Sequence, residues 1–313
     1  MDIIRTLAEA DTRAYVGDLK VLFFVITTLS LVGQLFTIIT YRSIRSKNNK
    51  FYGYVAMHSV LGLPWEIANY FNFAALQDEE TCKMVGFLYA FSYSAYLLWS
   101  SVIAWAIYSS LKNRTQVYNL NLRYLIGVYA ASFLLMLYPL CDDSFGKYIG
   151  KGITFCWFRS SGYNDFSFFM AYYAPLLLTT FFNGYCYVSS ATIVKKEYSK
   201  EESRQFYQFL VFPILQLVCN SDFYIRRISY LFTGTITVTA EVFHIILHKG
   251  EGLFEAIAYM LNPSVRKEVN KVWCTKRSPN NRILQNSFLI NESCIENELN
   301  ERTLRNQQLA NSF

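Results

Sequence analysis

The chain alternates between long apolar runs and short polar connections. Seven runs are long enough to form a helix across a bilayer, which takes roughly 20 residues. They lie at about 21–41, 52–75, 84–109, 124–140, 168–193, 207–228 and 238–262. The last two runs hold more polar and charged residues than the first five. We expect helices, because the runs are too long for barrel strands and do not alternate apolar with polar residues.

This pattern predicts an all-α membrane protein, a seven-transmembrane helix bundle with a short amphipathic eighth helix. We expect an extracellular N-terminus at 1–20, the bundle at 21–262, an amphipathic interfacial helix at 263–277 and a disordered cytoplasmic tail at 278–313. Pro263 ends the last run, and charged residues follow it at once. Cys274, near the end of the interfacial helix, is a candidate for palmitoylation.

The connections set the orientation, because Lys and Arg dominate alternate loops. The loop RSIRSKNNK contains basic residues and no acid, whereas the next loop, QDEETCK, is mostly acidic. The positive-inside rule then puts the N-terminus outside and the C-terminus in the cytoplasm. We expect a multi-pass protein of the plasma membrane. The basic residues expected at the cytoplasmic face are Arg42, Arg45, Lys112, Arg114, Lys195, Lys196 and Arg266.

Composition agrees with a lipid environment and excludes some functions. Hydrophobic residues make up 53% of the chain and charged residues 17%, against about 25% charged residues in soluble domains. The net charge of +6 is not concentrated in one segment, so no nucleic-acid partner is expected. The seven cysteines form no CxxC pair, and neither a metal nor a cofactor is predicted.

The last run carries a polar stripe. Its members recur at steps of three and four residues and are His244, His248, Glu251, Glu255, Tyr259 and Asn262. Ionisable groups that face lipid are costly, so the stripe should face the bundle interior. We interpret its outer part as a ligand site and its inner part as a switch network; a purely structural polar seam is the alternative. Lys249 lies off the stripe, and we expect it to extend outward.

Two other chemical interpretations of this run have less support. His244 and His248 have the spacing of metal ligands, but HIILHKGE is not HExxH. A retinal-type Schiff base on Lys249 would need burial and an acidic counter-ion, which its predicted position near the outer mouth disfavours. The chain has no Ser/His/Asp triad, P-loop or GxGxxG turn that we can recognise, so no enzyme activity is expected.

Prolines and cysteines add two further expectations. Pro175 and Pro213 interrupt the backbone ladders of the fifth and sixth runs, which allows both helices to kink beside the polar stripe. Cys82 and Cys156 both lie on the predicted outer side, so a disulfide between them is expected. Cys141 is a competing partner on the same side, and free cysteines remain an alternative.

Several motifs resemble those of G-protein-coupled receptors. The resemblance covers about residues 20–270, and its most specific part is the block Gly252–Arg266, GLFEAIAYMLNPSVR. More narrowly, the chain is similar to the cyclic-AMP-receptor-like branch known from amoebae and other protists. The further matching residues are Cys82, Cys156, Trp157, Tyr172, Pro175, Pro213, Cys219 and 225–228. The chain differs from that branch at Glu255, where its members usually carry Asn.

The resemblance implies a receptor for an extracellular ligand that signals to a heterotrimeric G protein. Candidate ligand contacts are Arg226, Arg227, His244, His248 and Glu251, at the outer ends of the spans. The basic inner residues would meet the G protein or, in a simpler interpretation, anionic membrane lipids. A transporter or channel whose path is lined by the stripe is the alternative, although no internal repeat supports it. A membrane-embedded enzyme would need acids and histidines on several spans, and we expect them on the last span alone.

Overall fold

The computed structural model describes residues 2–44, 51–114, 122–149, 154–159, 165–198, 211–212, 214–221, 225, 238–263, 265–266 and 269. The side chains that it describes begin at Leu19. The predicted positions Arg45, Pro213, Arg226, Arg227 and Cys274 lie outside the described residues, as does the tail at 278–313.

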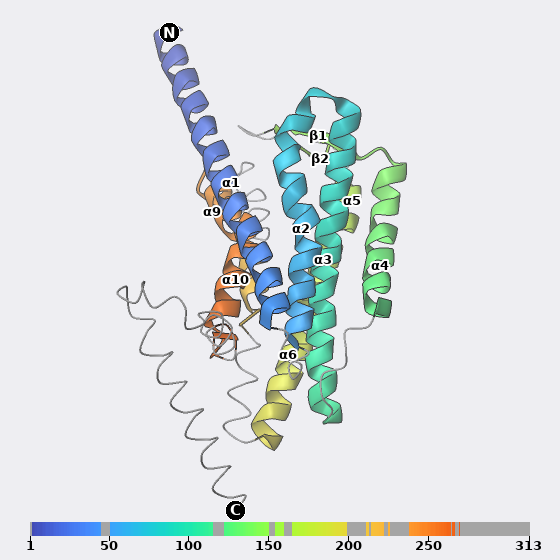
Figure 1. The fold of residues 1–313 in the computed structure, drawn as a ribbon. Coiled ribbons are helices and arrows are strands. Elements are labelled where there is room, and N and C mark those ends of the chain that lie inside the picture. Colours follow the sequence, from blue (N-terminus) through green and yellow to red (C-terminus); the bar gives the residue numbers. More distant parts are fainter. Residues whose placement is uncertain are drawn as a thin grey trace, which may run out of the picture.

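Helices make up most of the described chain (Figure 1). The long ones are α1 (Asp2–Ile44), α2 (Phe51–Ala74), α3 (Glu79–Asn113), α4 (Leu122–Cys141) and α6 (Ala174–Glu197). Shorter ones are η1 (Ala75–Gln77), α5 (Asp165–Phe168), the π-helical turn η3 (Phe169–Tyr173), α9 (Val238–Lys249) and α10 (Glu251–Leu261). Two strands, β1 (Phe145–Ile149) and β2 (Thr154–Phe158), form an antiparallel hairpin.

Helix α1 begins at Asp2, well before the predicted start at residue 21. Residues 2–18 contain no proline and several strong helix formers, so nothing in them stops the helix from extending. Three helical segments are long and apolar enough to cross a membrane: Leu19–Ser43 within α1, α3 and α4. These segments indicate a membrane protein.

The faces of α1 are reversed relative to those of a helix in a water-soluble protein. Its inward face is polar, and the buried side chains are Thr27, Ser30, Gln34 and Thr37. Its outward face is apolar, and the exposed side chains include Val21, Val25, Val32 and Ile39. A helix in water buries its apolar face instead, so this arrangement fits a solvent of lipid chains.

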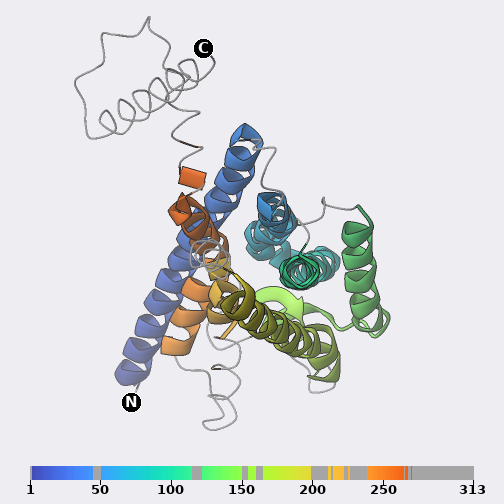
Figure 2. The ribbon, with the colours of Figure 1, turned by 90° about the horizontal axis from the view of Figure 1, so that it is seen from below.

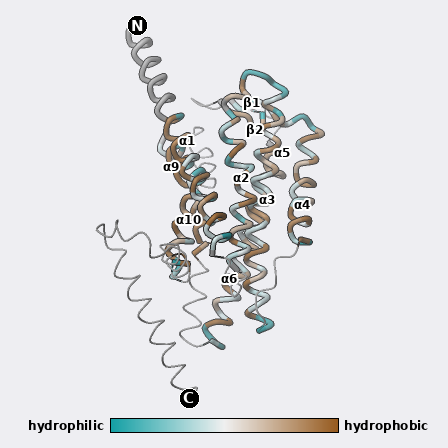
Figure 3. Tube along the Cα trace, viewed as in Figure 1, coloured by the Kyte–Doolittle hydropathy of each residue, from teal (hydrophilic) through white to brown (hydrophobic). Residues whose placement is uncertain are grey.

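Helices α4 and α6 show the same reversal. Ser132 of α4 is fully buried while Leu134 is 67% exposed, and Asn183 of α6 is buried while Phe181 is 74% exposed. Figure 3 shows hydrophobic residues along α4 and the membrane-length part of α1, and hydrophilic residues near the hairpin. Helix α6 therefore suits a lipid environment although it is not among the three segments that are long and apolar enough to cross a membrane.

Helix α3 lies at the centre of the bundle (Figure 2). It packs against α2, α4, α6 and both strands, while α1 packs against α2, α9 and α10. Helix α4 stands at the edge of the bundle, beside α3 (Figures 1 and 2). Two core clusters result, one at the hairpin end around Trp65 and one toward the opposite end around Trp99.

Two glycines bring α1 and α10 into close contact. A Cβ atom on Gly33 would lie 2.7 Å from the carbonyl oxygen of Gly252, and a Cβ atom on Gly252 would lie 2.6 Å from Ser30 Oγ. Small residues permit this approach, as is common between membrane helices. The Gly252 N–H donates to Ser30 Oγ at 3.0 Å, which satisfies one free donor at the start of α10.

The predicted fifth and seventh helices both contain an interruption. Pro175, which is buried, comes two residues after the π-helical turn η3. Because proline has no N–H, one backbone hydrogen bond of the helix cannot form at this point. In the last run, Gly250 separates α9 from α10 in a turn conformation. Gly250 N still donates to the carbonyl of Ile246, so the two helices follow one another closely. The predicted sixth helix is described as helical at 211–212 and 214–221.

The hairpin is an element that the sequence interpretation missed, since the segment before the fifth run was read as a loop. Strand β1 pairs with β2 from Phe145↔Phe158 to Ile149↔Thr154. A disulfide joins Cys82 at the start of α3 to Cys156 of β2, with the two Cα atoms 5.1 Å apart. The disulfide prediction is thus confirmed, and the competing partner Cys141 is a free, exposed cysteine.

Candidate functional site: a buried cluster of ionisable side chains

The interior of the bundle holds a cluster of ionisable side chains from four helices. Each of its members is at most 5% exposed. They are His58 and Glu66 on α2, Tyr96 on α3, His248 and Lys249 on α9, and Glu251 and Glu255 on α10. Buried charges are costly unless they are paired and hydrogen-bonded, so the contacts within the cluster determine what it can do.

One part of the cluster joins α2, α3 and α10 around Glu255. His58 Nδ1 lies 2.8 Å from Glu255 Oε1, and the Tyr96 hydroxyl donates to the same oxygen at 2.9 Å. His58 Nε2 lies 3.2 Å from the backbone carbonyl oxygen of Tyr96. The imidazole ring also stacks on the Tyr96 ring, with 3.8 Å between centroids. His58 is therefore held in one orientation from three sides.

The other part joins α1, α2 and α9 around Glu66. Ser30 Oγ donates to Glu66 Oε1 at 2.6 Å, and Asn69 Nδ2 donates to Glu66 Oε2 at 3.2 Å. The same Asn69 amide accepts from Lys249 Nζ at 3.1 Å. Asn69 thus connects a buried ammonium group to a buried carboxyl group, with its two amide atoms in the roles that each partner requires.

Aromatic rings enclose the ammonium group of Lys249. Its Nζ donates to the Tyr89 hydroxyl at 2.5 Å and lies 4.5 Å from the centroid of that ring and 5.6 Å from that of Trp65. Trp65, fully buried, also packs against Tyr96 and His248. Trp65 therefore fills the space between the two parts of the cluster.

The expectation that Lys249 extends outward is wrong. Lys249 is only 5% exposed and is buried between Asn69, Tyr89 and Trp65. The predicted stripe assumes one regular helix with a single buried face, whereas α9 ends at Lys249 and Gly250 adopts a turn. The lysine consequently has the burial and the nearby carboxyl group that the sequence interpretation considered missing.

The predicted stripe lies inside the bundle along most of its length. His248, Glu251, Glu255, Tyr259 and Asn262 are buried, whereas His244 is partly exposed and stacks on His248, with 5.0 Å between ring centroids. At the far end, the Tyr52 hydroxyl donates to Asn262 Oδ1 at 3.0 Å, and Tyr259 packs edge-on against Tyr52. The stripe thus connects to α2 at two levels, through Tyr52 at this end and through His58 at Glu255.

Sequence reasoning missed the contribution of α2 to the site. His58, Glu66 and Asn69 lie within the apolar run 52–75 and were not singled out. Polar and ionisable residues inside a membrane-length run are rare and costly, so their presence was itself a signal. Among the residues that the structure describes, no group of three or more His, Cys, Asp or Glu side chains has an arrangement that could hold a metal ion.

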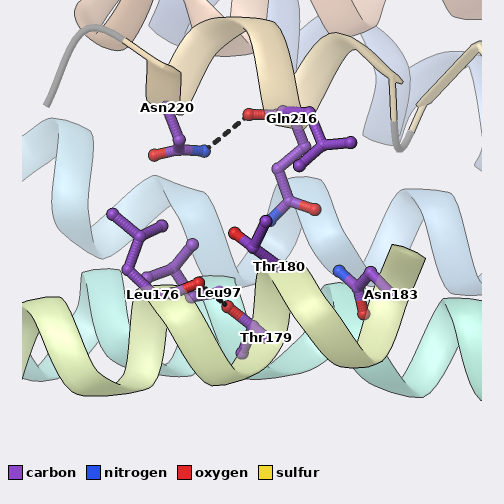
Figure 4. Close-up of a pocket in the computed structure, with 8 residues that line it drawn as sticks. Leu97, Leu176, Thr179, Thr180, Asn183, Gln216 and Asn220 are labelled. Carbon is purple, nitrogen blue, oxygen red and sulfur yellow. Dashed lines mark hydrogen bonds between the residues drawn. The ribbon is translucent and has the colours of Figure 1, made fainter. Parts of the chain in front are cut away.

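A small pocket lies between α3, α6 and the helical segment 214–221 (Figure 4). Its free volume is about 10 Å³, enough for a single water molecule. The pocket is uncharged, and its lining residues are Leu97, Leu176, Thr179, Thr180, Asn183, Gln216, Leu217 and Asn220. Figure 4 shows Gln216 extending toward Thr180 of α6. Asn183 Nδ2 donates to Ser100 on α3 at 2.9 Å, and Tyr93 of α3 donates to Asn220 Oδ1. These contacts link α3 to both helices through neutral groups.

The hairpin end of the bundle carries exposed ion pairs. Arg159 contacts Glu79 at 2.6 Å and Asp143 at 2.9 Å, and Lys83 contacts Asp143 at 3.1 Å. Hydrogen bonding from Lys83, assisted by the charge of Arg159, lowers the pKa of Asp143. Hydrogen bonds from Thr81 likewise lower the pKa of the α3 N-cap residue Asp78.

The basic residues predicted at the cytoplasmic face lie on the surface at the other end of the bundle. Arg42, Lys112, Arg114, Lys195, Lys196 and Arg266 are exposed. They follow or end α1, α3, α6 and α10, whose C-terminal ends all lie opposite the hairpin (Figure 1). Arg114 pairs with Glu197 of α6 at 2.9 Å, and hydrogen bonding to this carboxylate raises the pKa of Arg114.

Comparison with protein-family models and with curated proteins finds no match to this chain.

Proposed function

We propose that this chain is a seven-helix membrane receptor that binds an extracellular ligand and signals to a heterotrimeric G protein. The observation that carries the proposal is the polarity of the bundle. One end bears a hairpin tied to α3 by the disulfide between Cys82 and Cys156, and the other bears exposed basic residues on four helix ends. A rigid, disulfide-tied end suits the outside, and a basic end suits the cytoplasm.

The reversed helix faces support the membrane part of the proposal. Exposed apolar side chains on α1, α4 and α6, together with polar side chains inside, suit a bundle surrounded by lipid. Helices α2, α3, α9–α10 and the segment 214–221 would complete the seven. The C-terminal amphipathic helix at 263–277 remains a prediction, with Pro263, Val265, Arg266 and Val269 helical.

The interior contacts support a two-state mechanism. Ligand binding can shift a receptor only by its different affinity for two arrangements. Contacts such as Tyr52–Asn262 and His58–Glu255 join α10 to α2 and would differ between arrangements. His248 and Glu251, predicted as ligand contacts, are buried and would act within this interior network instead.

A second candidate, a secondary transporter or channel, is favoured by one observation. The buried ionisable groups come from α2, α3, α9 and α10 rather than from the last span alone. Intramembrane ionisable groups on several helices are typical of ion or proton paths. The same observation weakens the argument made from the sequence against a membrane-embedded enzyme.

One experiment separates these candidates. Purified protein in lipid vesicles is combined with G-protein α subunits, and nucleotide exchange is measured while a panel of extracellular compounds is added; uptake of the same compounds is measured in parallel. Exchange that depends on a compound, without uptake, supports the receptor. A variant with Lys195→Glu and Lys196→Glu on the exposed end of α6 should lose exchange, and the matched variant Lys83→Glu at the hairpin end should keep it. Electrogenic uptake without exchange would instead establish the transporter.

Orientation has its own test. Asn113 and Asn291 begin the two N-x-S/T triplets and lie on the proposed cytoplasmic side, so neither should carry a sugar. A new triplet placed at residues 150–153 should be glycosylated. The reverse pattern of modification would refute the proposed orientation and the receptor with it.

A further inference from the structure

The distances around His58 bear on which of its two ring nitrogens carries a hydrogen. The nitrogen Nε2 of His58 lies 3.2 Å from the backbone carbonyl oxygen of Tyr96, which can only accept. A lone pair on Nε2 would face the lone pairs of that oxygen in a buried site, so Nε2 carries the hydrogen. In a neutral imidazole the other nitrogen, Nδ1, is then an acceptor.

That acceptor lies 2.8 Å from Glu255 Oε1, which is also an acceptor when the carboxyl group is ionised. Two acceptors at this distance repel each other unless a proton lies between them. The Tyr96 hydroxyl does not supply it, because this hydroxyl already donates to Glu255 Oε1 at 2.9 Å. When Nε2 and Nδ1 both make a hydrogen bond at these distances, the pair therefore holds one proton more than a neutral histidine and a carboxylate do.

We propose that His58 and Glu255 form a buried proton-binding site in which one bound proton joins α2 to α10. The proton belongs to the pair, as an imidazolium beside a carboxylate or as a carboxylic acid that donates to Nδ1. Loss of the proton leaves Nδ1 and Oε1 repelling each other at contact distance, so the two helices must separate or His58 must turn away from Tyr96. The inference does not depend on whether the protein couples to a G protein.

The surroundings favour proton uptake. The titratable and charged groups near the pair are Glu66 on α2, Tyr96 on α3, Cys219 on the 214–221 segment, Lys249 on α9 and Glu251 on α10. Together with Glu255 they comprise three carboxyl groups and a single ammonium group, all at most 5% exposed. A buried excess of carboxylates is costly, and neutralising one carboxyl group reduces that cost.

The site can be observed directly by nitrogen NMR of the protein labelled with ¹⁵N-histidine in lipid nanodiscs. The chain has three histidines, so the variant His244→Gln leaves two sets of signals, and those that respond to Glu255→Gln belong to His58. We expect a hydrogen on Nε2 of His58 near neutral pH. We also expect either a second hydrogen on Nδ1, or a protonated carboxyl band in the infrared spectrum that Glu255→Gln removes. A lone pair on Nε2 would overturn the proposal, as would an Nδ1 without a hydrogen and no such band.

The substitution Glu255→Gln separates the bound proton from the rest of the site. The side-chain amide of the variant can donate to Nδ1 without a bound proton, so the Nδ1 hydrogen signal or the protonated carboxyl band should disappear. The matched variant Glu80→Gln, at an exposed acid of α3, should keep the wild-type spectra. Unchanged spectra in Glu255→Gln would contradict the proposal. If Glu255→Gln does not fold, the His244→Gln spectra recorded across pH decide the question alone.

Discussion

Removing the buried ammonium group should destabilise the protein, and removing its acidic partner at the same time should restore much of the loss. The perturbation is Lys249→Met, which is one heavy atom shorter, stays unbranched and removes the charge. Lys249 Nζ donates to Asn69 Oδ1 and to the Tyr89 hydroxyl, and Asn69 in turn donates to Glu66. Lys249 also interacts electrostatically with Glu66.

The magnitude follows from these contacts. Each hydrogen bond from a charged donor contributes about 1.5–3 kcal/mol, and the ring contacts of a desolvated cation add about 0.5–2 kcal/mol. Part of this sum is offset, because methionine packs well against rings and carries no desolvation cost. Removing one member of a buried charged pair costs about 3–5 kcal/mol, so we expect a loss of about 3 kcal/mol for Lys249→Met.

Glu66→Gln should have a smaller effect in the Lys249→Met background than alone. The amide oxygen that Glu66→Gln introduces can still accept from Ser30, and the double variant leaves no unpaired charge. We expect a coupling energy of about 2 kcal/mol between the two sites. The assay is reversible denaturant unfolding in lipid nanodiscs, with a double-variant cycle at constant pH. Lys112→Met, at an exposed lysine of α3, is the control and should change stability by less than about 0.5 kcal/mol. Additivity of the two substitutions to within about 0.5 kcal/mol would refute the connection through Asn69.

Three further predictions concern the ends and the packing of the bundle. Gly33→Val should cost about 1–3 kcal/mol, because its Cβ would meet the α10 backbone at 2.7 Å; Gly127→Val, which has no atom within 4 Å of its Cβ, is the control, and thermal unfolding is the assay. Cys82→Ser should cost about 2–5 kcal/mol by opening the disulfide that closes the loop to the hairpin, whereas Cys141→Ser should leave the melting temperature unchanged. The lowered pKa of Asp143 stabilises the hairpin end above the ordinary aspartate pKa of about 3.9, and this contribution is lost as pH falls through the lower folded pKa. Asp143→Asn should therefore abolish the acid-induced rise in hydrogen exchange of the hairpin, and an unchanged acid profile would contradict this assignment.

The helices were predictable from the sequence because long apolar runs have few alternatives. The runs 52–75 and 124–140 match α2 and α4 to within two residues at each end. The interior location of Glu255 and Asn262 followed from helical spacing and from the cost of exposing such groups to lipid. The seven-helix arrangement itself remains a prediction, since the sixth run is described only in part.

The contacts within the site were not predictable to the same degree. Helical spacing gives the face on which a residue lies, but not the partner on another helix. Glu66 and His58 were missed because hydropathy averages hide single polar residues in an apolar run. Lys249 was misplaced because the buried face of α9 is wider than one helical stripe, and the side chains that receive the ammonium group, Asn69, Tyr89 and Trp65, belong to other helices. The hairpin was missed because its strands have five residues each, too few for a clear alternating pattern.

The distribution of contacts in the interior bears on which helix can move most easily. Helix α10 is fixed to α1 by the glycine contact and to α2 by buried charged or ionisable groups. Inside the bundle, helix α6 is connected to α3 by neutral groups, beside a small pocket that the segment 214–221 also lines. Its ion pair with α3, Arg114–Glu197, is exposed, and the helix starts from a π-helical turn. Shifting α6 exposes no buried charge, whereas shifting α10 would separate His58 from Glu255. In a two-state receptor, α6 would therefore be the element that moves at low cost, and release of the proton from the His58–Glu255 pair would be required before α10 could follow.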